Sequence, residues 1–139
     1  MTTPTAYEKP LPVKTAENAL YWDSAKAHAL QLPRCGACGT FRYPPTPYCP
    51  TCLSEETEWQ EISGRGTIYS FIIVHQRYDP SFAEDLPYNV AVVELEEGPR
   101  LVSNVVDVDN KELHIGMPLT ITYDDITEEF TLPKFRPQN

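Results

Sequence analysis

Two matched cysteine pairs, Cys35-Gly36-Ala37-Cys38 and Cys49-Pro50-Thr51-Cys52, decide the fold of the N-terminal part of this chain. They are separated by ten residues and contain all four cysteines of the 139-residue sequence. Two residues between paired cysteines let one tight turn point both sulfurs at the same ion, and four thiolates complete a tetrahedral site. Because nothing in the sequence indicates secretion, the spacing predicts a metal-binding ribbon at Cys35, Cys38, Cys49 and Cys52 rather than two disulfides.

Zinc is the usual metal of a four-thiolate site, and iron is the alternative, because Cys38-Gly39 and Cys49-Pro50-Thr51-Cys52 also resemble rubredoxin. We expect the zinc to be structural, since four protein ligands leave no position for a substrate or a water molecule. The site uses every thiol of the chain, so no cysteine remains as a nucleophile. Gly36 and Gly39 fit this interpretation because glycine tolerates a crowded turn.

Length and composition indicate one domain, or a small module joined to a modest one. The 41% hydrophobic content supports a real core. No apolar run approaches the roughly 20 residues that span a bilayer, so no membrane partner is expected. The start, Met1 to Thr5, lacks the basic and apolar regions of a secretory signal. Together these features predict a cytoplasmic protein.

Charge is divided unevenly along the chain. Residues 1–56 carry five Lys/Arg and five Asp/Glu, whereas residues 57–139 carry six Lys/Arg against fifteen Asp/Glu and so account for the whole net charge of −9. Nucleic-acid binding depends on cationic side chains that release counterions from the phosphate backbone. The charge therefore argues against a nucleic-acid partner.

The chain divides into five expected segments. These are an extended arm over 1–15, a helix over 16–32, a zinc ribbon over 33–56, an OB-fold over 57–133 and a tail over 134–139. Thr15 can cap the helix and Pro33 can end it. Tyr21 and Trp22 on the helix either pack on the ribbon or dock on a partner, since such rings are common interface anchors.

Six segments are rich in β-branched and aromatic residues and predict strands. They cover residues 59–62, 67–75, 88–95, 100–108, 119–123 and 130–132. With glycine-marked bends and no second helix, they favour a small closed barrel of the OB type. The expected fold is mainly β, with an N-terminal helix, a rubredoxin-like zinc ribbon and a five- to six-stranded OB-fold barrel.

The helix, the four cysteines and several later segments resemble a family of zinc-ribbon OB-fold proteins known as domain of unknown function thirty-five, which is also described as acyl-CoA-associated. The segments that carry the resemblance are Gly64–Phe71, Val74-His75, Pro87–Ala91, Val93–Leu101, Gly116–Pro118 and Leu132–Pro137. They cover most of the chain and are more specific than the cysteine motif alone.

This resemblance implies a function that composition could not give. Such proteins work as non-catalytic accessory subunits of thiolase-superfamily enzymes, including thiolases, acyltransferases and retro-aldolases, that act on acyl-CoA thioesters. It implies a thiolase-superfamily subunit as the partner, with acyl-CoA itself and an enoyl-CoA hydratase-like subunit as further candidates. The chain would then not be an enzyme on its own, and no catalytic residue is assigned.

CoA carries phosphates and a long pantetheine arm, so its contacts should combine cations with apolar side chains. The candidates for contact with CoA or a partner are Arg65, His75, Arg100, Lys134, Phe135 and Arg136. Lys134 and Arg136 come first, because they flank Phe135 in the expected tail. His28 and His114 are better explained as structural.

Two other classes of function remain open from the sequence. OB-folds and zinc ribbons both occur in single-stranded nucleic-acid binders, although the charge is unfavourable here. A rubredoxin-like electron carrier would hold iron instead of zinc.

Overall fold

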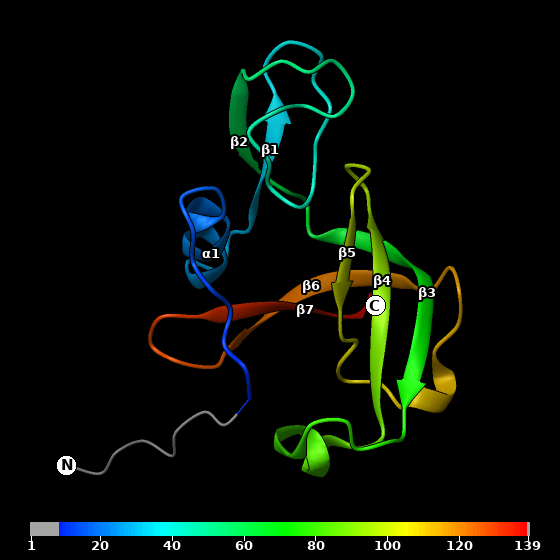
Figure 1. The fold of residues 1–139 in the computed structure, drawn as a ribbon. Helices are drawn as coiled ribbons and strands as arrows, with labels where there is room; N and C mark the ends of the chain where they lie inside the picture. The colour runs from blue at the N-terminus through cyan, green and yellow to red at the C-terminus, as the bar shows by residue number, and fades with distance from the viewer. Residues whose placement is uncertain (1–8, 139) are drawn as a thin grey trace, which may run out of the picture.

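The computed structural model describes residues 9–138 and contains one α-helix and seven strands in that range (Figure 1). In chain order they are α1 (Ala19–Lys26), β1 (Gln31–Cys35), β2 (Thr57–Glu61), β3 (Arg65–Val74), β4 (Tyr88–Leu95), β5 (Arg100–Ser103), β6 (Pro118–Asp125) and β7 (Thr131–Pro137). Two short 3₁₀ helices, η1 (Pro80–Asp85) and η2 (Asn110–Glu112), lie in the connections.

The strands form two sheets. The antiparallel pair β1–β2 carries the ribbon, and the order β5-β4-β3-β6-β7 forms the larger sheet. That sheet curls until its edges meet: the Val106 N–H donates to the Phe135 carbonyl at 2.7 Å, and the Phe135 N–H donates to the Asn104 carbonyl at 3.1 Å. The predicted mainly β fold, with a helix, a ribbon and an OB-type barrel, is confirmed.

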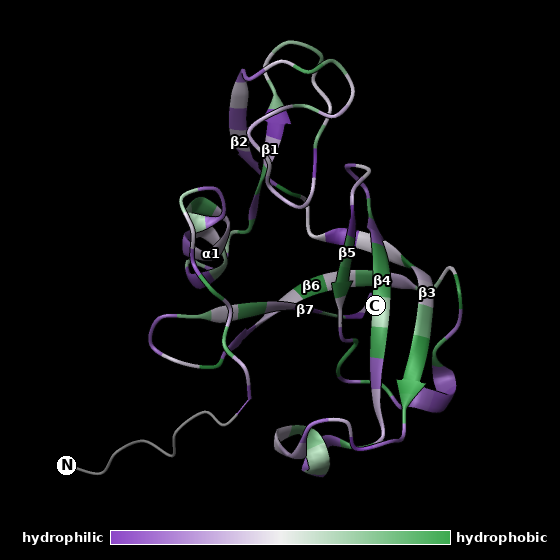
Figure 2. Ribbon diagram, in the orientation of Figure 1, coloured by the Kyte–Doolittle hydropathy of each residue, from purple (hydrophilic) through white to green (hydrophobic). Residues whose placement is uncertain are grey.

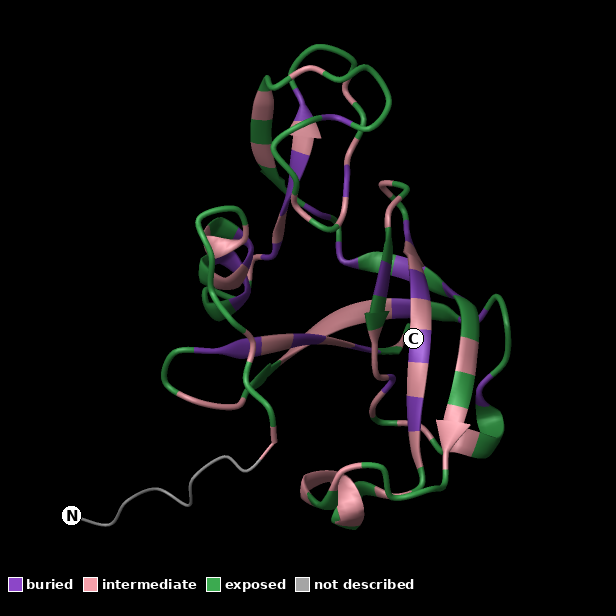
Figure 3. Ribbon diagram, in the orientation of Figure 1, coloured by how far each residue is buried: buried purple, intermediate pink, exposed green. Residues whose placement is uncertain are grey.

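Alternating burial along β4 explains how the barrel forms its core. Every second residue of this strand is buried, from Asn89 to Leu95, as Figure 3 shows. Ile68 of β3 and Phe135 of β7 meet Val93 in the same core cluster. Each such side chain contributes roughly 1.5–3 kcal/mol by leaving water. Gly66 lets β3 and β4 approach, because a Cβ there would lie 2.7 Å from the Glu94 carbonyl oxygen.

The Asn89 side chain joins β4 to the segment that follows β5 by hydrogen bonds. Its amide donates to the Val105 carbonyl at 2.8 Å, and its side-chain oxygen accepts from the Val105 N–H at 2.7 Å. The same amide reaches the side-chain oxygen of Asn110 at 3.0 Å. A buried amide is tolerated in an apolar core because its hydrogen bonds are made within the protein.

The helix is shorter than the predicted 16–32. It ends at Lys26, and His28 adopts the left-handed φ of 59° that often follows a helix. Residues beyond it pair with β2 instead, with Pro33 opposite Trp59. The expected strand over 59–62 therefore belongs largely to the ribbon sheet. Pairing with β2 outweighed the helical pattern of residues 27–32, which the sequence alone could not show.

The predicted tail over 134–139 is instead the end of β7. Phe135 pairs with Ile121 of β6 and is fully buried, at 0% exposure. Proline interrupts the usual strand pattern here, yet β7 tolerates Pro133 and Pro137 because it lies at the edge of the regular sheet order. The part of the expected arm that covers residues 1–8 lies outside the described residues.

Candidate metal centre

Both cysteine pairs adopt the same turn. In the first, the Cys35 N–H donates to the Thr40 carbonyl and the Gly39 N–H donates to the Cys35 carbonyl, each at 2.9 Å. In the second, the Cys49 N–H donates to the Ser54 carbonyl at 2.9 Å and the Leu53 N–H donates to the Cys49 carbonyl at 2.8 Å. This repeated turn points the two sulfurs of each pair toward the other pair.

The four sulfurs are spaced as ligands of one ion. The Sγ atoms of Cys35 and Cys52 are 3.5 Å apart, those of Cys38 and Cys49 are 3.6 Å apart, and all four lie within 4.8 Å of one another. Metal–sulfur bonds of about 2.3 Å in a tetrahedron place sulfurs about 3.8 Å apart. The donor set and its spacing therefore fit a single metal ion bound by four thiolates.

Backbone N–H groups lower the pKa of two of the thiols, which favours the thiolate form that binds a metal. The Cys38 and Ala37 N–H groups each lie 3.4 Å from the Cys35 sulfur and lower the pKa of that thiol. The Cys52 and Thr51 N–H groups likewise lower the pKa of Cys49 to about 6. For Cys52 the Ser54 N–H lowers the pKa, but the neighbouring sulfurs and burial raise it to about 12. Four thiolates repel one another, and a cation among them removes that repulsion.

Arg42 supports the ribbon and was not anticipated from the sequence. Its side chain is buried, with Nε and Nη2 donating to the Thr46 carbonyl at 3.0 and 2.7 Å. Nη2 also donates to the Thr57 hydroxyl at 2.7 Å, which ties the long loop between the cysteine pairs to β2. The sequence around Arg42, which is rich in prolines and aromatic residues, does not predict that its side chain joins the loop to β2.

The two aromatic docking candidates on α1 are used within the chain. Tyr21 is only 5% exposed and packs against the Tyr43 ring of the ribbon, with centroids 5.4 Å apart. Trp22 is half-buried and meets the Phe130 ring edge-on at 5.7 Å. Tyr21 is therefore not a docking residue, because its side chain already lies in the core.

The candidate CoA contacts do not converge on one site. Arg65 pairs with Glu96 at 2.7 Å on the barrel surface, and Arg100 pairs with Glu94 at 3.1 Å. His75 and Arg136 are exposed. Phe135 is buried in the barrel, so the expectation that it contacts CoA or a partner was wrong.

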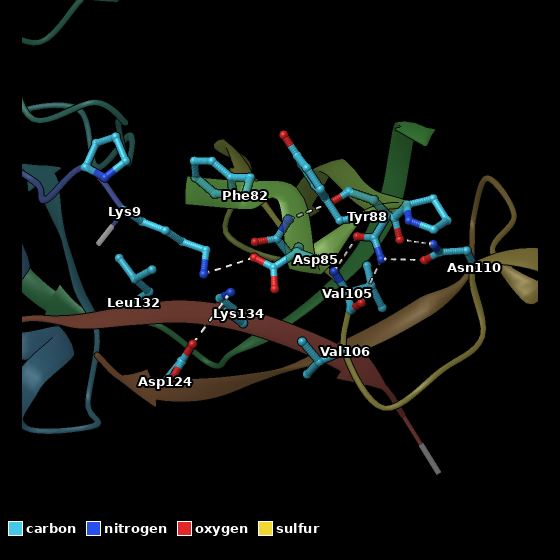
Figure 4. A pocket seen from close by; sticks show the side chains of 14 residues that line it. Lys9, Phe82, Asp85, Tyr88, Val105, Val106, Asn110, Asp124, Leu132 and Lys134 are labelled. Carbon is cyan, nitrogen blue, oxygen red and sulfur yellow. Dashed lines mark hydrogen bonds and ion pairs between the residues drawn. The ribbon is translucent and has the colours of Figure 1, made fainter. Parts of the chain in front are cut away.

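Two of the candidates line cavities: Arg65 lines one beside Glu94 and Glu96, and Lys134 lines another. Figure 4 shows this cavity of about 520 Å³, formed by η1, the barrel closure and the β6–β7 hairpin. The Lys134 ammonium lies 3.6 Å from Asp124, and across the cavity Lys9 pairs with Asp85 at 3.0 Å. Phe82 and Leu132 add apolar wall.

Comparison with known proteins places these features in a family. Residues 22–58 match the rubredoxin-like zinc ribbon domain of ChsH2, and residues 59–124 match its C-terminal OB-fold domain. A DUF35 domain-containing scaffold protein of Methanocaldococcus jannaschii is 37% identical over 98 residues, which cover 69% of this chain and 68% of that protein. The chain belongs to the DUF35 family.

Other relatives show the settings in which DUF35 proteins occur. A solved structure titled "Ltp2-ChsH2(DUF35) aldolase" matches 91% of this chain and 98% of that one, with 42% identity and a TM-score of 0.83. A probable enoyl-CoA hydratase alpha subunit of Thermomonospora curvata is 42% identical over 93% of this chain but only 40% of its own length. This chain thus spans about two fifths of that subunit.

Two further matches extend the comparison. A benzoylsuccinyl-CoA thiolase subunit of Thauera aromatica is 31% identical over 72 residues, which are 52% of this chain and 48% of that subunit. A DUF35 protein of Sulfolobus solfataricus, at 16% identity and a TM-score of 0.64 over 90% of this chain and 87% of that one, shares the fold. Within the described residues, no helix is long and apolar enough to cross a membrane.

Proposed function

We propose that this DUF35 protein is a non-catalytic accessory subunit that binds and stabilises a thiolase-superfamily enzyme acting on acyl-CoA thioesters. The observation that carries the proposal is the 42% identity, over nearly the whole chain, to the partner of Ltp2 in a solved aldolase. The scaffold proteins and the benzoylsuccinyl-CoA thiolase subunit among the relatives support the same role.

The positions of the histidines agree with an accessory role. His28 lies on the surface, stacked on Tyr123 and paired with Asp125 at 2.9 Å. The His114 ring nitrogen lies 3.2 Å from the Glu112 carbonyl, two residues away, and His75 is exposed beyond β3. A general base needs a partner that orients its ring beside the reacting atoms. The His28–Asp125 pair links the end of α1 to the end of β6, and the His114 contact lies within its own loop.

The metal in this proposal is structural zinc. Zinc would hold the loops of both cysteine pairs together, and the ribbon would in turn brace α1 through the Tyr21–Tyr43 contact. The cavity beside Lys134 is the place where this subunit would touch acyl-CoA, because it combines a cation with apolar wall. The relatives named as hydratase alpha subunits are longer than this chain, so each contains a part that this chain does not match. A separate enoyl-CoA hydratase-like subunit that supplies such a part is a further candidate partner.

Affinity purification from the native organism, followed by mass spectrometry, tests the proposal. A thiolase-superfamily protein in near-stoichiometric amount is the expected result. Recovery of this chain with its metal and without such a protein would contradict the proposal. Iron in place of zinc would favour an electron carrier, and tight, salt-sensitive binding to single-stranded DNA would favour the nucleic-acid class.

Cys35→Ser tests whether partner binding depends on the metal-bound ribbon. We expect metal content to fall from one ion per chain to nearly none, because folding of small zinc modules depends on roughly 10–16 kcal/mol of metal binding. The partner should be lost with it. Elemental analysis measures the metal, and co-purification measures the partner. Ser54→Ala is the control, since Ser54 adjoins the site without contributing a sulfur. Full assembly by the Cys35→Ser protein would exclude a role for the ribbon.

A further inference from the structure

Strands β3 and β4 have the composition of strands that are covered on both faces. Figure 2 shows green, hydrophobic colouring along much of both. In β4 the core takes Ala91, Val93 and Leu95, yet the alternate side chains on the other face include Val90 and Val92. An antiparallel sheet with one face in water normally alternates apolar and polar residues. The outward residues Ile72, Val90 and Val92 depart from that pattern, whereas Thr67, Ser70 and Glu94 keep it.

The outward apolar side chains are neighbours. Val92 lies directly opposite Val102 of β5, and Val90 lies opposite Ile72 of β3. A bulge between Ile68 and Ser70 carries Tyr69, whose ring lies 3.7 Å under the Arg100 guanidinium. We call the set Tyr69, Ile72, Val90, Val92 and Val102 the outer patch.

The outer patch faces solvent within the described chain. Val102 is 66% exposed, Ile72 60% and Tyr69 47%, while Val90 and Val92 are partly exposed between them. A contiguous apolar surface of this kind on a sheet is typical of a protein–protein contact. Tyr69 with Arg100 supplies the aromatic and arginine pair that is common at the centre of such contacts.

Charge decides which occupant fits the outer patch. The patch itself carries no carboxylate, and Glu94, two residues after Val92 on β4, is paired with Arg100 at 3.1 Å. The barrel as a whole is acidic, since residues 57–139 hold fifteen acidic and six basic side chains. A second copy would bring the same excess of negative charge to the contact, which is unfavourable. A partner surface that is apolar at its centre and basic at its rim would be complementary.

We propose that the outer patch is the surface by which this chain docks on its thiolase-superfamily partner, through an apolar surface rimmed with Lys and Arg. This inference rests on the proposed function and adds the face that is used. Contact through the opposite side of β3 and β4 is closed, because the core fills it. Docking would bury Ile72 and Val102. The partner would then cover the outward apolar residues of β3 and β4, which face solvent in the free chain.

The test uses the whole 139-residue chain. It has two probes: the Ltp2 subunit of the similar complex, and the thiolase-superfamily protein encoded in the same genome that co-purifies with the wild-type chain. Ile72→Lys and Val102→Lys place a cation on the patch without touching the core. Each should weaken binding about thirtyfold or more, as expected at a contact centre. Val13→Lys is the matched control, because Val13 is 76% exposed on the arm and should bind like wild type.

Metal content and circular dichroism check that each variant is folded. Wild-type affinity should also fall as salt is raised, because the complementary charges are screened. Wild-type affinity in both patch variants would overturn the choice of face, and so would equal loss in Val13→Lys. Failure of the wild-type chain to bind either probe would instead overturn the proposed function. Dimerisation of the free chain that Ile72→Lys abolishes would assign the patch to a second copy and reject the proposal.

Discussion

At the scale of single residues, the position directly after each cysteine pair has the same backbone conformation but a different side chain. Gly39 and Leu53 occupy equivalent places after their cysteine pairs, and both have left-handed backbones, with φ of 79° and 65°. Glycine adopts this conformation without steric cost, whereas a side chain costs roughly 1–2 kcal/mol there. Leu53 is 74% exposed, so its side chain recovers little of that cost within the chain.

Leu53→Gly is therefore expected to stabilise the metal-bound protein by about 0.5–1 kcal/mol, after the greater flexibility of unfolded glycine is allowed for. Urea unfolding at neutral pH with saturating zinc measures the change. Leu53→Ala is the control, because it removes the side chain but keeps the strained backbone. An equal gain in Leu53→Ala would show that exposure of the leucine, and not its backbone conformation, is the unfavourable feature.

At the scale of elements, β7 closes the barrel where a tail was expected. Phe135 is the largest fully buried side chain of the described residues, and its backbone makes two of the hydrogen bonds that join the sheet edges. Phe135→Ala should cost about 3–5 kcal/mol in the free energy of unfolding, since the cavity cannot collapse between two sheet edges.

Its neighbour Arg136 provides the matched control for β7. Arg136 is exposed on the same strand, so Arg136→Ala should change stability by no more than about 0.5 kcal/mol. Thermal unfolding of both variants makes the comparison. Similar stability of Phe135→Ala and Arg136→Ala would mean that the barrel does not depend on its last strand.

Local patterns predicted the elements that local chemistry determines. The cysteine spacing predicted the ribbon, and the β-branched runs near 67–75 and 88–95 predicted β3 and β4. Errors arose where a distant partner decides the structure. Residues 31–35 pair with β2, and residues 131–137 pair with β6, although prolines in both segments argue locally against strands. The CoA candidates were chosen by side-chain type, and only the folded chain shows that Phe135 is buried while Lys134 lines a cavity.

At the scale of the whole molecule, three tyrosines join the helix, the ribbon and the barrel. Tyr21 of α1 packs on Tyr43 of the ribbon, and the Tyr123 hydroxyl of β6 accepts the Leu30 N–H at 2.9 Å. Burial, followed by the charge of Tyr43, raises the pKa of Tyr21 well above 10.0. Burial also raises the pKa of Tyr123, against a smaller opposing effect of the Leu30 N–H.

This junction should make the protein sensitive to alkali. The folded state raises both pKa values above the ordinary 10.0, so the stability they contribute is complete below pH 10.0 and is lost as the pH rises through the folded values. Metal-bound thiolates carry no proton, whereas the thiols of the unfolded chain ionise at about pH 8.5, so the ribbon gains stability as the pH rises through that range and opposes the fall caused by the tyrosines. Urea unfolding between pH 8 and 11 should show a steep fall that Tyr21→Phe reduces, whereas Tyr78→Phe, at an exposed position, should leave it unchanged. An identical slope in Tyr21→Phe would mean that the junction opens before its tyrosines ionise, and that the helix and ribbon are held to the barrel by other contacts.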